Sequence, residues 1–139
     1  MLDTILLAED SLNDQELMII ALKKAHIATQ LVIANDGEEA LDYLLCRGKF
    51  ASRPAGNPAL ILLDLKMPKL NGIEVLRVLR STPEISRVRV VIITGSVMEE
   101  DLSNSYKFGI ESFIIKPVEF EDLVRVAKDI KKICISNDS

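Results

Sequence analysis

The chain has 139 residues, 48% of them hydrophobic and 27% charged, which is typical of one soluble globular domain. Its 17 basic and 21 acidic residues give a net charge of -4, which argues against nonspecific binding to nucleic acid. The N-terminus lacks the basic region of a signal peptide, and no apolar run approaches the roughly 20 residues of a membrane span. Cys46 and Cys134 match no metal-ligand spacing and imply no disulfide framework. We expect a single cytoplasmic domain over residues 1–139, with no membrane partner.

Five apolar runs of strand length alternate with helical patterns. The runs cover residues 4–8, 30–34, 60–63, 88–93 and 112–115, the second being the weakest. All five contain at least one β-branched residue, a residue type that favours strands. Their near-continuous hydrophobicity predicts strands covered on both faces, as in a parallel sheet.

Helical patterns follow each run. They cover residues 11–25, 36–48, 71–83, 99–109 and 119–134. The second opens on Asp36 with Glu39 three residues later, a capping-box arrangement, and is expected to stop at Gly48. The fourth ends at Gly109, a natural residue after a helix C-terminus.

This β-α alternation predicts a flavodoxin-like, doubly wound, five-stranded parallel sheet in the order 2-1-3-4-5 with five helices. We expect the core to span about residues 4–133, with a short tail at 134–139. Residues 48–58 are rich in Gly and Pro and predict an exposed loop before the third strand, whose role the sequence does not indicate.

Polar side chains stand where these strands end. They are Glu9 and Asp10 after the first strand, Asp64 after the third, Thr94 after the fourth and Lys116 after the fifth. Taken singly, each fits a helix cap, a turn or a solvated surface group. Together they are expected at the sheet edge where such folds bind ligands.

The three acids of this edge imply a cation. Like charges about 4 Å apart repel by about 4 kcal/mol at an effective dielectric of about 20, a sizeable part of a domain's stability. Carboxylate oxygens without His or Cys ligands suit Mg²⁺. An ion pair with Lys116, or direct hydrogen bonds without metal, is the alternative. If Mg²⁺ bridges Asp10 and Asp64, Asp64 on the central strand is the candidate nucleophile for a phosphoryl group, forming an aspartyl phosphate.

Four motifs, "LLAED", "LLDLKMPKLNG", "IITGS" and "FIIKP", each fall at a strand end. In this order they resemble a response-regulator receiver domain over about residues 4–133. The "ED" and "SYKFG" sequences and the long loop before the third strand further resemble the small stand-alone regulators of phytochrome-type histidine kinases. This resemblance implies a phospho-accepting regulator of a two-component, histidine-to-aspartate signalling system.

The resemblance also implies roles for individual residues. Asp64 would accept the phosphoryl group from a kinase phosphohistidine and later lose it by self-dephosphorylation, without turnover of an external substrate. The metal site would comprise Glu9, Asp10, Asp64 and the main-chain carbonyl of Lys66. Thr94 and Lys116 would bind the phosphoryl group, Thr94 and Phe113 would form the switch, and Pro117 would follow a cis peptide bond.

Two positions depart from the receiver pattern. Phe113 stands where many relatives have Tyr, so its rotation would offer no phenolic hydrogen bond. Glu9 stands where many relatives have Asp, and its longer side chain would reach the metal through water or compete with Lys116.

Output is expected to pass through protein contacts, because no effector domain fits after Ile133. The expected partners are a sensor histidine kinase and a downstream or phosphotransfer protein. The switch surface would include Met98, Leu102 and Tyr106, although core packing explains most of these apolar residues as well. Three residues of the last helical pattern and the tail suggest a homodimer or partner face: Val126, Ile133 and Ile135.

Two other functions share part of this pattern. A haloacid-dehalogenase-like phosphohydrolase would need a second Asp two residues after the nucleophile, where this chain has Lys66. A receiver-like scaffold or binding module that never accepts phosphate remains the alternative, although degenerate receivers lack acids, Thr or Lys that are all present here.

Overall fold

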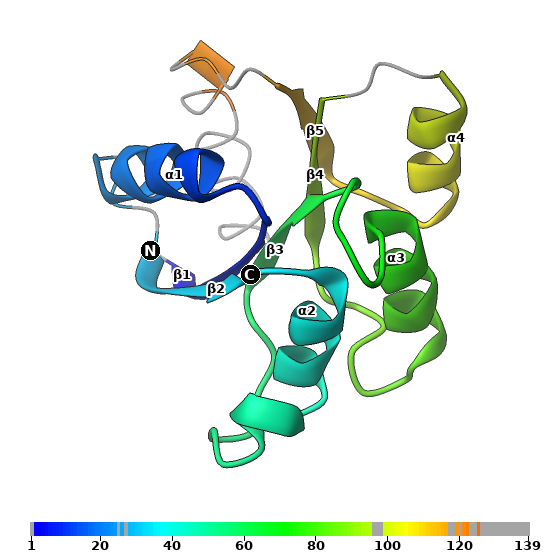
Figure 1. The fold of residues 1–139 in the computed structure, drawn as a ribbon. Coiled ribbons are helices and arrows are strands. Elements are labelled where there is room, and N and C mark those ends of the chain that lie inside the picture. Colours follow the sequence, from blue (N-terminus) through cyan, green and yellow to red (C-terminus); the bar gives the residue numbers. More distant parts are fainter. Residues whose placement is uncertain are drawn as a thin grey trace, which may run out of the picture.

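Five parallel strands form one sheet in the order β2-β1-β3-β4-β5, which confirms the predicted flavodoxin-like topology (Figure 1). The strands are β1 (Leu2–Ala8), β2 (Ala28–Ala34), β3 (Leu60–Asp64), β4 (Val90–Thr94) and β5 (Ser112–Ile115). This computed structural model describes residues 2–24, 26, 28–95, 99–116, 119, 121–122 and 125.

One strand boundary was predicted too early. β4 begins at Val90 rather than Val88, because the main chain of Val88 is used elsewhere. Its N–H donates to the carbonyl of Ile85, and its carbonyl accepts from the Arg80 guanidinium. Val88 therefore belongs to a turn, although its side chain is buried as the apolar pattern predicted.

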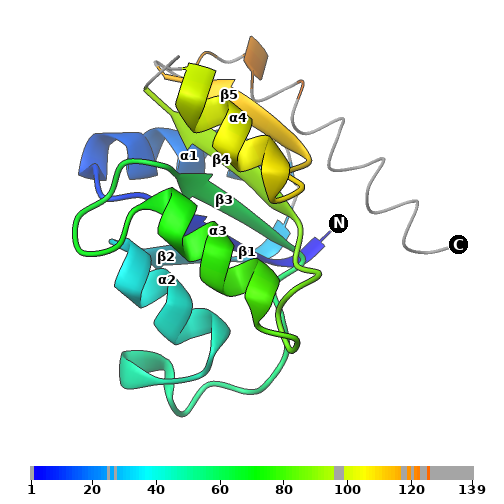
Figure 2. The same cartoon turned by 90° about the vertical axis from the view of Figure 1, so that its right-hand side faces the viewer.

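Helices cover both faces of the sheet. The described part of the chain contains α1 (Leu12–Lys24), α2 (Gly37–Leu44), the 3-10 helix η1 (Gly48–Phe50), α3 (Gly72–Ser81) and α4 (Glu99–Lys107). Figures 1 and 2 show α1 on one face and α2, α3 and α4 on the other. Of the fifth predicted helix, Glu121, Asp122 and Arg125 are helical, and the rest of its span and the tail lie outside the described residues.

The strands separate two apolar clusters, because side chains alternate between the faces of a sheet. Leu6 and Leu63 pack with residues of α2 and α3, whereas Leu7 and Leu62 pack with Met18 of α1. Every residue of β3 and of β4 is buried. This double coverage explains why both sequences are apolar without alternation.

The first turns of α2 and α3 differ from the prediction. The Asp36 side chain accepts from the Glu39 N–H at 2.8 Å, as expected, but Glu39 pairs with Lys49 and does not complete the capping box. The complete box lies at α3, where Asn71 and Glu74 each accept from the other's main-chain N–H.

The second helix also ends earlier than predicted. It stops at Leu44, and Cys46 then adopts a left-handed conformation with φ 52°. Residues 48–58 begin with η1, and most of them are exposed. Arg53 donates to the Tyr43 carbonyl and lies 4.0 Å from the centre of the Tyr43 ring, so the loop is held against α2.

None of the described helices is long and apolar enough to cross a membrane.

Candidate functional site

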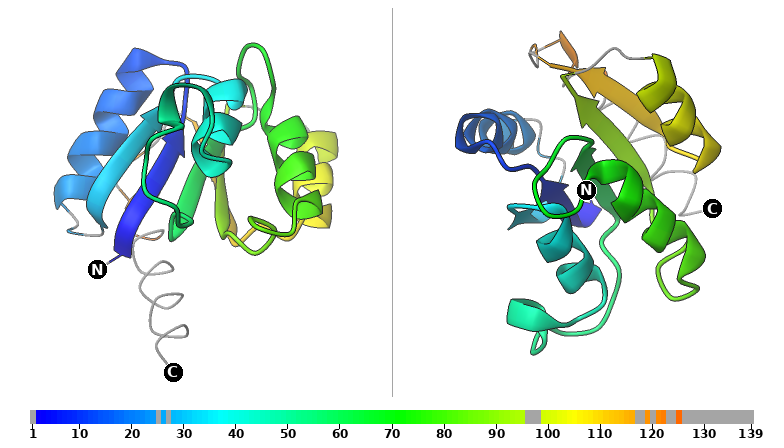
Figure 3. Two further views of the ribbon diagram at one scale, coloured as in Figure 1. Left: turned by 90° about the horizontal axis from the view of Figure 1, so that it is seen from below. Right: turned by 45° about the vertical axis from the view of Figure 1, so that its right-hand side comes forward.

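The register of the sheet brings the predicted polar residues to one edge. Ala8 lies opposite Leu63, Asp64 opposite Ile93, and Thr94 opposite Ile115. Residues that end these strands or directly follow them must therefore lie close together. The β3–α3 loop extends beyond this edge (Figure 3).

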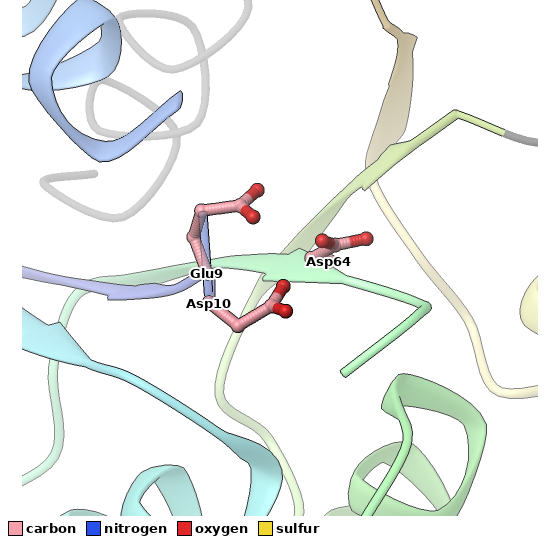
Figure 4. Close-up of side chains that lie close together, drawn as sticks. All are labelled: Glu9, Asp10 and Asp64. Atoms are coloured by element: carbon pink, nitrogen blue, oxygen red, sulfur yellow. The ribbon is translucent and has the colours of Figure 1, made fainter. Parts of the chain in front are cut away.

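Three carboxylates meet at the ends of β1 and β3. Oxygen atoms of Glu9, Asp10 and Asp64 all lie within 4.8 Å of one another, and Figure 4 shows the three carboxylates gathered beside the strand ends. Glu9 is 1% exposed and Asp64 is 3% exposed, whereas Asp10 is exposed. The expected acidic cluster is thus present, with two acids buried and one open to solvent.

The Lys116 ammonium lies between three carboxylates. Its Nζ lies 2.8 Å from Glu9 Oε2, 2.9 Å from Asp14 Oδ2 and 3.0 Å from Asp64 Oδ2. Its main-chain N–H donates to the Thr94 carbonyl at 2.7 Å, which joins β4 and β5 at the site. An ammonium group has three N–H donors, so these three carboxylates can use all of them.

Burial and charge shift two pKa values in this group. Burial raises the pKa of the Glu9 carboxyl to about 7, although Lys116 and the Ser11 N–H favour its charged form. Burial alone would lower the pKa of the Lys116 ammonium, but its contacts with Glu9, Asp14 and Asp64 outweigh burial and raise that pKa. Lys116 is therefore cationic at neutral pH.

Main-chain groups hold the two buried acids in place. The Ser11 N–H donates to Glu9 Oε1 at 3.0 Å, and the Lys66 N–H donates to Asp64 Oδ1 at 3.1 Å. Gln15 of α1 donates through Nε2 to the Glu9 carbonyl at 2.6 Å. Both carboxylates therefore have fixed positions before any ligand binds.

The β3–α3 loop is fixed by two close backbone contacts at glycines. A Cβ atom on Gly37 would lie 1.8 Å from the Leu70 carbonyl oxygen, and one on Gly72 would lie 2.6 Å from the Asp64 carbonyl oxygen. No other residue fits these positions without a backbone shift. The glycines thus keep the loop against α2 and beside Asp64.

The residues present fit a divalent cation. All the side-chain donors are hard carboxylate oxygens from Glu9, Asp10 and Asp64, the ligand type preferred by Mg²⁺ and Mn²⁺. The ion-pair alternative is also realised, because Lys116 contacts two of these acids. It does not account for Asp10, for which the described part of the chain offers no ion pair. An open cavity of about 470 Å³ adjoins Asp10 and Lys66.

Thr94 is the last residue of β4, and Phe113 lies within β5. Thr94 is fully buried, and Phe113 is half-buried. The Phe113 ring packs edge-on against Tyr106 of α4, with ring centres 6.2 Å apart. Two predicted residues, Pro117 and Met98, lie outside the described residues, as do Val126, Ile133 and Ile135, and the Leu102 side chain is also not described.

Sequence reasoning missed Asp14 and Gln15. Both lie in the first turn of α1, where the polar residues of the sequence predict only helix capping. The available signal was that Asp14 lies at the start of the helical pattern that directly follows the acids at the end of the first strand.

Comparison with known proteins agrees with this geometry. A family model described as "Response regulator receiver domain" matches residues 5–128. Response regulator Rcp1 of Synechocystis sp. is 36% identical over 91% of this chain and 85% of its own length. The bacteriophytochrome response regulator RtBRR has 44% identity and a TM-score of 0.85, over 94% of this chain and 78% of that one. The phosphorylated cyanobacterial phytochrome response regulator RcpA has 35% identity and a TM-score of 0.81, over 97% and 95%.

This chain belongs to the response regulator receiver domain family. Receiver domains are the phosphoryl-accepting regulators of two-component systems and work with a histidine kinase; they are not enzymes that turn over an external substrate. A divalent metal bound at an acidic pocket is typical of them, and a structure of Rcp1 is described as its Mn²⁺-bound form. The flavodoxin-like fold and the receiver resemblance predicted from the sequence are both confirmed.

Proposed function

We propose that Asp64 is the phosphoryl acceptor of this receiver domain. The observation that carries the proposal is its position at the end of the central strand, 3% exposed and 3.0 Å from the Lys116 ammonium. A rigid strand and the Lys66 N–H fix the carboxylate, and Lys116 supplies positive charge where negative charge gathers during transfer.

The proposed phosphoryl donor is a phosphohistidine of the kinase. A carboxylate oxygen of Asp64 attacks phosphorus, a P–O bond forms, and the P–N bond breaks with its electron pair returning to the imidazole. Lys116 and the Thr94 hydroxyl are proposed to bind oxygens of the transferred group. Water then hydrolyses the acyl phosphate, which returns Asp64 to its free form as inorganic phosphate leaves.

We assign the metal site to Glu9, Asp10, Asp64 and the main-chain carbonyl of Lys66, with Mg²⁺ as the ion. The ion would neutralise charge on the phosphoryl oxygens when bound. Asp10 is exposed, and its carboxylate lies close to those of the two buried acids. An ion bound there would therefore be accessible from solvent on the side of Asp10. The Mn²⁺-bound form of Rcp1 supports a divalent ion in a relative of this chain.

Phosphorylation is proposed to switch the face formed by α4 and β5. Thr94 would move toward the phosphoryl group, and Phe113 would fill the space it leaves. Because Phe113 packs against the half-exposed Tyr106, a movement of Phe113 would change the surface of α4. That surface is our candidate contact for a downstream or phosphotransfer protein, or for a homodimer.

The partner is proposed to be a phytochrome-type histidine kinase. We place this protein and its kinase in the cytoplasm. The similarity to RcpA and RtBRR, which are described as phytochrome and bacteriophytochrome regulators, supports this choice.

Intact-mass spectrometry after incubation with acetyl phosphate tests the proposal. Wild-type protein should gain one phosphoryl group with Mg²⁺ and none with EDTA, and Asp64→Asn should gain none. Glu16→Gln, which removes an exposed carboxylate of α1, is the matched control and should be phosphorylated like wild type. If wild-type protein gains nothing and also fails to bind beryllofluoride, the domain acts as a receiver-like scaffold instead.

A further inference from the structure

Asp14 differs from the other acids that contact Lys116. Its Oδ2 lies 2.9 Å from the Lys116 Nζ, as close as the oxygens of Glu9 and Asp64. Unlike them, it comes from a helix, its side chain is 30% exposed, and it is not a member of the carboxylate cluster that fits a cation. Lys116 is thus shared between two acids of that cluster and one acid outside it.

A bound cation would weaken the attraction of Lys116 to Glu9 and Asp64 more than its attraction to Asp14. The charges of Glu9 and Asp64 would be largely neutralised by the ion, and the ion itself would repel the Lys116 ammonium. Asp14 would retain its charge, because it takes no part in the cluster. Among the described residues that contact Lys116, Asp14 is then the acid that still attracts its ammonium group.

The helix dipole and a main-chain hydrogen bond hold Asp14 in place. It lies in the first turn of α1, where the helix dipole favours a carboxylate, and its N–H donates to Ser11 Oγ at 3.3 Å. Lys116 is fixed at its backbone by the hydrogen bond to Thr94. Contact between the two side chains therefore limits where the Lys116 ammonium can lie.

We propose that Asp14 is a positioning residue that holds Lys116 at the phosphorylation site when the cation is bound, so that the ammonium is available to the phosphoryl group. The proposal rests on the proposed function of Asp64 and Lys116. Asp14 acts through Lys116 and makes no bond to the transferred group. An ordinary helix-stabilising role for Asp14 would change stability but not the binding of a phosphoryl analogue.

The test compares Asp14→Asn with Glu16→Gln, an equal loss of charge on the same helix. Beryllofluoride affinity in saturating Mg²⁺ and the rate of phosphorylation by acetyl phosphate should both fall about three- to tenfold in Asp14→Asn and stay unchanged in Glu16→Gln. Mg²⁺ affinity without beryllofluoride should change by less than about twofold, since Asp14 is outside the cluster. Equal beryllofluoride affinity and equal rates in the two variants would overturn the proposal.

A double-mutant cycle separates action through Lys116 from a general electrostatic effect. In a Lys116→Met background, Asp14→Asn should no longer change the phosphorylation rate. If it slows Lys116→Met by the same factor as wild type, Asp14 does not act through Lys116 and the proposal is wrong. If wild-type protein itself gains no phosphoryl group, the proposed function fails and this inference fails with it. Normal phosphorylation of wild type and Asp14→Asn alike would overturn the inference alone.

Discussion

Lys116 Nζ lies 3.0 Å from Asp64 Oδ2, so the carboxylate proposed to accept the phosphoryl group already has an ion-pair partner. The same ammonium contacts Glu9 and Asp14, which makes it the counter-ion of the buried acids. A cation and a phosphoryl group must therefore enter a site whose charges are already partly balanced. The contribution of Lys116 to the free energy of unfolding should therefore be measurable.

Lys116→Met should lower the free energy of unfolding of the metal-free protein by about 3 kcal/mol, because buried carboxylates would lose their counter-ion. Saturating Mg²⁺ should restore much of that loss by supplying positive charge. Urea unfolding with and without Mg²⁺ measures both effects. Lys69→Met removes an ion pair at 3.5 Å between a largely exposed lysine and Asp36, and it should cost less than about 1 kcal/mol. A stability loss in Lys116→Met that Mg²⁺ leaves unchanged would contradict this account.

Metal affinity should depend on pH through Glu9. The pKa of its carboxyl is raised from 4.5 to about 7 in the folded protein, chiefly by burial. Its contribution to the stability of the metal-free protein is therefore present below about pH 4.5 and is lost as the pH rises through about 7. A cation needs the charged carboxylate, so Mg²⁺ affinity should rise over the same range.

Calorimetric titrations with Mg²⁺ at about pH 6 and about pH 8 check this prediction, and buffers of different ionisation enthalpy should reveal proton release at the lower pH. Glu9→Gln should bind Mg²⁺ more weakly, with a much smaller dependence on pH. Equal wild-type affinity at the two pH values would show that Glu9 does not titrate with metal binding.

Gly72→Ala should lower the free energy of unfolding by about 1–3 kcal/mol, because the new Cβ would lie 2.6 Å from the Asp64 carbonyl oxygen and from Leu65 Cα. The strain falls on the backbone that carries Asp64, so phosphorylation should slow as well. Gly95→Ala is the matched control, since its Cβ would meet only Lys116 Cβ at 4.0 Å. Unfolding midpoints and phosphorylation rates that are alike in both variants would disprove the close contact.

Arg80 of α3 joins two loops at the opposite edge of the sheet. Its guanidinium donates to the carbonyls of Phe108, Ser86 and Val88 at 2.6, 2.9 and 2.6 Å, and to Gly109 at 3.1 Å. Arg80→Met should lower the free energy of unfolding by about 2–3 kcal/mol, because charge-assisted hydrogen bonds are lost and partly buried carbonyls are left unpaired. Arg77→Met, on the exposed face of the same helix, should have little effect in the same urea titration. A similar loss in both variants would exclude this role for Arg80.

The sequence predicted most of the fold because its apolar runs are local signals. Residues 60–63 are all buried, and the uninterrupted apolar sequence of this run indicates a strand covered on both faces. The site followed from topology, since Asp64 and Lys116 each stand at the end of a predicted strand and parallel strands end at one edge.

Contacts between distant side chains were not predictable in the same way. The approach of Asp14 to Lys116 depends on where the first turn of α1 lies relative to the end of β5, and the hydrogen bonds of Arg80 depend on two loop conformations. The ion pair of Glu39 with Lys49 replaces the capping bond that the local sequence pattern predicted. No feature of the sequence marks the left-handed conformation of Cys46.

The most direct test of the central claim locates the phosphoryl group. Protein phosphorylated with acetyl phosphate and Mg²⁺ is reduced with borohydride, which converts an aspartyl phosphate to homoserine, and the peptides are sequenced by tandem mass spectrometry. We predict homoserine at position 64 only. Homoserine in place of Asp10 or Asp14, with residue 64 recovered as aspartate, would contradict the assignment of Asp64 as acceptor.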